Sequence, residues 1–161
     1  MNIPFSPPDI TEEEIEAVAE VMRSGWITTG PKTKELERKM AEFTHTNRGV
    51  CLNSATSCME MALRLFEIGP GEVIVPAYTY TASASVVCHV GATLRLVDVE
   101  KGTFHIDYAA VESMINENTK AIIPVDLGGV MVDYDRIRAI VESKKSLFRP
   151  SSKMQEALGH I

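Results

Sequence analysis

Short apolar runs alternate along the chain with longer segments in which apolar residues recur at helical spacing. The run Val73-Ile74-Val75 is continuously apolar, which is typical of a strand buried on both faces of a sheet. Strands are predicted at residues 49–53, 72–76, 93–99 and 120–126, and the helices that follow them at 55–67, 80–90, 107–116 and 134–144. This alternation indicates an α/β fold with a mostly parallel sheet and helices on its faces.

Two more helices are predicted ahead of the first strand. Thr11 and Glu14 have the spacing of a capping box, so a helix should start there and end at Ser24-Gly25. A second helix is predicted over residues 31–43, with apolar residues at core spacing: Leu36, Met40 and Phe43. The expected organisation is therefore a helical segment of about residues 1–45 followed by strand–helix units.

Composition and charge narrow the function classes. The 161 residues carry a net charge of −6, which argues against a nucleic-acid partner. We expect no membrane span and no signal peptide, because no apolar run is long enough and the N-terminus lacks a basic and an apolar region. The three cysteines, Cys51, Cys58 and Cys88, have no C-x-x-C spacing, so buried reduced thiols, no metal site and a cytoplasmic location are expected.

The junction Ser54-Ala55-Thr56-Ser57 is a candidate phosphate site. It joins the predicted strand 49–53 to a helix, and all of its side chains are small or hydroxylated. The first backbone N–H groups of a helix are unpaired and carry partial positive charge, so small side chains would let an anion approach them. The alternative is an ordinary N-capped helix, because Ser and Thr are favoured caps.

A second junction follows the buried strand 72–76. Tyr78 and Tyr80 come directly after Pro76, at the carboxyl end of that strand. Ligands of parallel α/β sheets bind beyond the carboxyl ends of the strands, so one junction could hold an anion while the other offers a ring face. The alternative for a loop tyrosine is half-buried packing. Asp98 and Asp126 end predicted strands at the same edge, and we expect both to cap turns.

Several segments together carry a family resemblance. They occur in order as NIPFSPPDITEEEIEAV (residues 2–18), GWITTGPKT (25–33), NSATS (53–57), VIVPAYTYTASA (73–84), GATLRLVDVE (91–100) and KAIIPVDLGG (120–129). This set resembles the DegT/StrS family of pyridoxal-phosphate-dependent nucleotide-sugar aminotransferases, and the resemblance thins after about Lys145. It implies an aspartate aminotransferase-like, fold type I large domain that is incomplete, with residues 1–161 as its amino-terminal part.

The resemblance also implies a cofactor, partners and site residues. Pyridoxal 5′-phosphate (PLP) would accept an amino group from an amino-acid donor and pass it to a nucleotide-linked keto-sugar. Ser54, Ala55 and Thr56 match the phosphate-binding turn, and Tyr80 matches the residue that stacks on the pyridine ring. A homodimer is implied. The residues that match a segment at the mouth of the site, in contact with substrate or partner subunit, are Trp26, Thr28, Thr29 and Gly30. Trp26 could equally anchor the end of its helix.

The family's Schiff-base lysine and the acid that pairs with the ring nitrogen are expected beyond Ile161, so no catalytic residue is predicted here. By this interpretation the 161-residue chain is inactive. Ser152 and Gln155 have the spacing of a capping box, so a helix is predicted from there to Gly159. It should lead into a strand at His160-Ile161, so Ile161 is not expected to be a natural terminus. Two alternatives stay open: a sugar dehydratase of the same family, with histidine replacing the lysine, and a non-catalytic PLP- or nucleotide-binding module.

Overall fold

A computed structural model describes residues 3–4 and 6–159 of the chain. The chain divides into two compact units, Met1–Cys51 and Leu52–Ile161, which are described separately. The strand expected to start at His160-Ile161 lies outside the described residues. None of the helices in the described part has the length and apolar character needed to cross a membrane.

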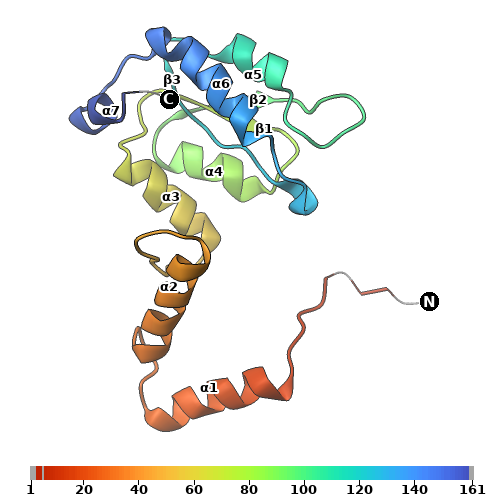
Figure 1. Ribbon diagram of the computed structural model, residues 1–161, viewed down its shortest axis with the longest axis vertical. Coiled ribbons are helices and arrows are strands. Elements are labelled where there is room, and N and C mark those ends of the chain that lie inside the picture. Colours follow the sequence, from red (N-terminus) through yellow and green to blue (C-terminus); the bar gives the residue numbers. More distant parts are fainter. Residues whose placement is uncertain (1–2, 5, 160–161) are drawn as a thin grey trace. The chain divides into compact units, whose positions relative to one another are not determined.

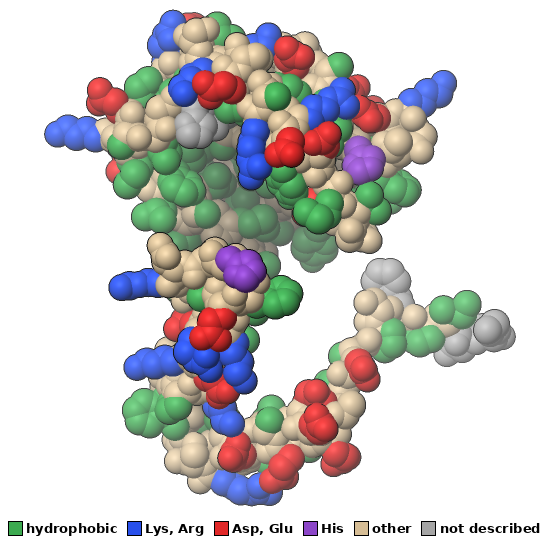
Figure 2. Space-filling view, in the orientation of Figure 1, with side chains coloured by type: hydrophobic (Ala, Val, Ile, Leu, Met, Phe, Trp, Pro, Cys, Tyr) green, Lys and Arg blue, Asp and Glu red, His purple; other side chains and the backbone are tan. Residues whose placement is uncertain are grey.

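The first unit contains helices α1 (Glu12–Ser24) and α2 (Pro31–Phe43) (Figure 1). The predicted capping box is present: the Thr11 hydroxyl accepts from Glu13 N at 3.2 Å, and the Glu14 carboxylate accepts from Thr11 N at 2.6 Å. Gly25 ends α1 in the left-handed conformation, with φ 72°, which a glycine adopts without steric cost. Acidic and basic side chains lie interspersed over this unit (Figure 2).

Two predictions for this unit are wrong. Leu36, Met40 and Phe43 are 51%, 47% and 81% exposed, because α1 does not cover them: its own apolar residues Ile15, Val18 and Met22 are exposed as well. Residues 49–53 form no strand, and no strand among the described residues pairs with them. A β-prone run becomes a strand only where a neighbouring backbone supplies hydrogen-bond partners, which local pattern alone does not reveal.

The second unit is built on a parallel sheet in the order β2-β1-β3. The strands are β1 (Glu72–Pro76), β2 (Thr93–Val97) and β3 (Thr119–Ile122). In the register, Ile74 of β1 lies opposite Arg95 of β2 and Ile122 of β3. β2 and β3 end earlier than predicted, at Val97 and Ile122: β2 pairs with all five residues of β1, as far as Pro76, and β3 pairs with three of them, as far as Ile74.

Helices cover both faces of this sheet (Figure 1). Val73 and Val75 pack with α3 (Ala55–Leu65) and α4 (Thr81–His89). Ile74 points to the other face and packs with α5 (Tyr108–Met114) and α6 (Tyr134–Lys144). All three side chains are 0% exposed, and burying each contributes about 1.5–3 kcal/mol. The predicted α/β fold with helices on both faces is confirmed.

The chain continues through short 3₁₀ turns at Leu127–Gly129 and Lys145–Leu147 to α7 (Lys153–Leu158). Ser152 caps α7 as predicted, because its hydroxyl accepts from Gln155 N. The reciprocal half of the expected capping box is replaced: the buried Gln155 side chain accepts from Ser151 N and donates to Glu67 O at 2.6 Å. This amide therefore ties α7 to the connection between α3 and β1.

Candidate functional site at the carboxyl edge of the sheet

The N-termini of α3 and α4 lie at the carboxyl edge of the sheet. α4 connects parallel strands β1 and β2, so it begins at the edge where β1 ends. The C-terminal halves of α3 and α4 are joined: Arg64 donates to His89 O at 3.2 Å, and Glu60 lies 2.9 Å from the His89 ring nitrogen. The two helices therefore run in the same direction and start at the same edge (Figure 1).

The predicted phosphate turn forms the N-terminus of α3. Ser54 is the N-cap, and its hydroxyl accepts from Ser57 N at 3.1 Å. The backbone N–H groups of Ala55 and Thr56 find no acceptor among the residues that the structure describes. The Ala55 side chain is small and exposed. Two free N–H donors at the positive end of a helix, with no large side chain to block the approach, are suited to bind a phosphate group.

Tyr80 is the N-cap of α4 and is 81% exposed. Its ring is therefore not part of either hydrophobic cluster of this unit. It belongs to the same sheet edge as Ser54, Ala55 and Thr56, because both helices begin there. Its role as a stacking residue stays a prediction, but an exposed ring at this edge is what that role requires.

A second aromatic feature of this edge was missed by the sequence analysis. Tyr78 stacks on Phe104, with ring centroids 5.2 Å apart and an interplanar angle of 19°. Phe104 belongs to the loop after β2, and Tyr78 to the loop after β1. Loops that follow neighbouring parallel strands lie at one edge of the sheet. An aromatic residue after each strand was therefore the sequence signal for this contact.

Asp98 and Asp126, which follow β2 and β3 along the chain, have structural roles, as expected. The Asp126 carboxylate accepts from Val132 N at 2.8 Å and from the Tyr134 hydroxyl at 2.9 Å, so it holds the turn that leads into α6. Burial first, and then this bond to Asp126, raise the pKa of the Tyr134 hydroxyl above its ordinary value. Asp98 accepts from Val99 N at 2.8 Å.

The loop expected at the mouth of the site belongs to the first unit. Trp26 Nε1 donates to Thr29 O at 3.1 Å, so the indole folds back over its own loop. The Thr28 and Thr29 hydroxyls make no hydrogen bond within the described residues, and both residues are exposed. Gly30, by contrast, is buried and caps α2.

The cysteines are free, as expected, but Cys58 and Cys88 are exposed and Cys51 is half-buried, so the expectation of buried thiols is wrong. Cys58 and Cys88 fall on the outer faces of α3 and α4, which periodicity over short helices did not distinguish. In the part of the chain that the structure describes, no cluster of His, Cys, Asp or Glu could hold a metal ion.

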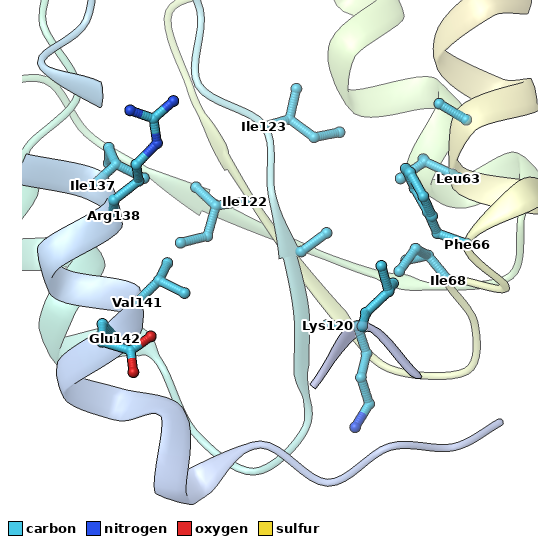
Figure 3. A pocket seen from close by; sticks show the side chains of 13 residues that line it. Leu63, Phe66, Ile68, Lys120, Ile122, Ile123, Ile137, Arg138, Val141 and Glu142 are labelled. Carbon is cyan, nitrogen blue, oxygen red and sulfur yellow. The ribbon is translucent and has the colours of Figure 1, made fainter. Parts of the chain in front are cut away.

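A cavity of about 660 Å³ lies away from this edge, beside β3 (Figure 3). Apolar side chains dominate its lining, among them Phe66, Ile122 and Val141. Lys120 borders it, but its ammonium turns away and donates to the backbone oxygens of Glu117 and Arg149. Burial lowers the pKa of Lys120. The cavity has no converging set of polar groups, so the carboxyl edge remains the candidate site.

Comparison with known protein families shows to which family the chain belongs. The model of the DegT/DnrJ/EryC1/StrS aminotransferase family matches residues 8–148. The chain belongs to this family. Pyridoxal phosphate is the cofactor of its aminotransferases, which agrees with the phosphate-type turn at Ser54, Ala55 and Thr56.

Solved structures of the family support the same fold. Spr1654 from Streptococcus pneumoniae, named as a sugar aminotransferase, is 59% identical over 100% of this chain and 41% of its own, with a TM-score of 0.96 for the apo form. Its PMP and PLP forms both give 0.95. The sugar aminotransferase CalS13 from Micromonospora echinospora is 29% identical over 90% of this chain and 40% of its own, with a TM-score of 0.84. The chain thus spans about two fifths of the length of these relatives.

Proposed function

We propose that this chain supplies the cofactor-phosphate part of a PLP-dependent aminotransferase that acts on a nucleotide-linked keto-sugar. The observation that carries the proposal is the N-terminus of α3, where Ala55 and Thr56 present free N–H groups. This helix end shares the carboxyl edge of the sheet with the exposed Tyr80. Membership of the aminotransferase family supports pyridoxal phosphate as the ligand proposed for them.

Each residue has a distinct part in this proposal. Ala55 and Thr56 N–H groups donate to the cofactor phosphate, while Ser54 fixes the first turn by bonding Ser57 N. The dipole of α3 favours the anion by about 0.3–2 kcal/mol. Tyr80 lies against the ring and fixes its plane. When bound, the cofactor supplies an electron sink for the carbon that exchanges its amino group.

The names of the relatives support part of the proposal for substrate and partners. Spr1654 and CalS13 are both named as sugar aminotransferases, which supports a sugar acceptor. We propose that the sugar is nucleotide-linked and that an amino acid donates the amine. The loop of Trp26, Thr28, Thr29 and Gly30 would contact the sugar or a partner subunit in a cytoplasmic homodimer.

The proposal is tested on the full-length gene product loaded with PLP. An amino-acid donor such as glutamate should convert the bound cofactor to pyridoxamine phosphate, seen as loss of its visible absorption band. A nucleotide-linked keto-sugar should then restore that band and yield an amino-sugar by mass spectrometry. No conversion with any common amino acid would contradict the proposal. Formation of a dehydrated sugar in place of an amino-sugar would favour the dehydratase alternative.

A further inference from the structure

Glu60 joins the two helices that carry the candidate site. Its Oε1 atom accepts from Arg64 Nε at 2.9 Å, and its Oε2 atom lies 2.9 Å from Nδ1 of the His89 ring. The Arg64 guanidinium in turn donates to His89 O at 3.2 Å. These three residues, two on α3 and one on α4, form a closed set of contacts, which we call the α3–α4 clamp.

The clamp is important because few other contacts fix α3 among the described residues. Leu63 is the one buried residue of this helix, and the partly buried Met59 packs against the same cluster. Every hydrogen bond that joins α3 to α4 within the described structure belongs to the clamp. The position of α3 relative to α4 therefore depends on a small apolar contact and on these polar contacts.

Glu60 is the central residue of the clamp. The hydrogen bond from Arg64, and after it the one from His89, lower the pKa of the Glu60 carboxyl, so the charged form is favoured. Arg64 and His89 lie in the last turns of their helices, where the helix dipole favours a cation even without a partner. A dipole role does not need Glu60, whereas a contact between the two helices does.

α3 and α4 each carry one part of the proposed cofactor site. The free N–H groups of Ala55 and Thr56 lie at the start of α3, and Tyr80 is the N-cap of α4. One PLP molecule has to reach the N–H groups with its phosphate and the tyrosine with its ring. Because a short helix moves as a rigid element, a shift at the clamp would change the distance between these two parts.

We propose that Glu60 is a positioning residue, which clamps α3 to α4 and so holds the phosphate-binding N–H groups at the distance from Tyr80 that PLP requires. The inference rests on the proposed function, which gives the two helix ends a common ligand. Glu60 contacts His89 in the last turn of α4, at the end opposite to Tyr80. It therefore acts on the cofactor through the helices and not by contact.

The positioning role is tested on the full-length gene product by comparing PLP with pyridoxal, which lacks the phosphate. Glu60→Gln keeps the size of the side chain but removes its charge. It should weaken PLP binding in equilibrium dialysis by about fivefold, less than the roughly tenfold or greater loss expected when a whole hydrogen bond to a charged group disappears. Pyridoxal binding should change by less than about twofold, because a ligand without a phosphate does not need α3.

Glu142→Gln is the matched control. Glu142 forms an ion pair with Lys145 at 3.2 Å, but this pair lies on α6 and the turn after it, so it does not join α3 to α4. The affinities of this variant for PLP and pyridoxal should equal those of wild type. Glu60→Gln combined with His89→Ala should bind PLP as Glu60→Gln alone does, since both changes break the same contact.

The outcomes separate the inference from the proposed function. Unchanged PLP affinity in Glu60→Gln, beside a wild-type protein that binds PLP and transfers an amino group, would overturn the inference alone. Equal weakening of PLP and pyridoxal would also overturn it, because that pattern indicates a general loss of structure. Effects of Glu60→Gln and His89→Ala that multiply would contradict the clamp. A wild-type protein that binds no PLP would overturn the proposed function and this inference with it.

Discussion

Ala55→Ile is expected to weaken PLP binding by the full-length protein by about 10- to 100-fold. A β-branched side chain at the first position of α3 would crowd the approach to the N–H groups of Ala55 and Thr56. A hydrogen bond to a charged group contributes about 1.5–3 kcal/mol, and each 1.4 kcal/mol changes a dissociation constant tenfold. Equilibrium dialysis of PLP against the variant measures the effect directly.

Ala55→Ser is the matched control, because it adds a single small atom at the same site. Its PLP affinity should stay within about threefold of wild type, or 0.6–0.7 kcal/mol. Ala55 is exposed, so neither variant should change the free energy of unfolding by more than about 0.5 kcal/mol. Unchanged PLP affinity in Ala55→Ile would contradict the assignment of this helix end to the phosphate.

Tyr80→Ala is expected to lower PLP affinity by about tenfold and to leave the fold intact. Stacking between an aromatic side chain and a planar ring contributes about 1–3 kcal/mol. Tyr80 is 81% exposed, so removing its ring creates no cavity in the core. The rate of PLP loss during gel filtration, beside urea unfolding of the same variant, separates cofactor retention from stability.

Tyr80→Phe distinguishes the ring from the hydroxyl. If stacking is the role, this variant should retain PLP as wild type does, because it keeps the aromatic face. Equal loss of PLP in Tyr80→Phe and Tyr80→Ala would assign the effect to the hydroxyl instead. A Tyr80→Ala variant that keeps PLP but unfolds more easily would show that the ring has a packing role.

The sequence predicted elements whose signals are local. Thr11 and Glu14 marked the start of α1, and Ser54 marked the start of α3, because a cap needs only residues within one turn. The continuous apolar run Val73-Ile74-Val75 predicted a strand covered on both faces, and all three side chains are fully buried. Such a run has one favourable place in an α/β fold, at the centre of a sheet.

Features that depend on distant parts of the chain were not predictable. Residues 49–53 have strand-like composition but no paired neighbour in the described structure. The periodicity of α2 marks Leu36, Met40 and Phe43 as one face, but it does not show what covers that face. Gln155 fits a capping box by spacing, yet its amide instead bonds Glu67 O, 88 positions away.

Some residues of the candidate site could be predicted from the sequence, and others could not. The Ser54–Thr56 turn could be located because small residues stand where a helix begins, and Tyr80 because it follows a buried strand. The sequence does show an aromatic residue after each of two strands, Tyr78 and Phe104, but not that these strands are neighbours, so the stack was missed. The hydrogen bond from the Trp26 indole to Thr29 O was also hidden, because sequence spacing does not tell which way an indole turns.

A crystal structure of the full-length protein with PLP would show directly whether the N-terminus of α3 binds the cofactor phosphate. We expect phosphate oxygens within about 2.7–3.2 Å of the backbone nitrogens of Ala55 and Thr56, as hydrogen bonds require. We also expect the Tyr80 ring to lie against the pyridine face. A phosphate bound elsewhere, with the N-terminus of α3 occupied by water or by another segment of protein, would contradict the proposed role of this helix end.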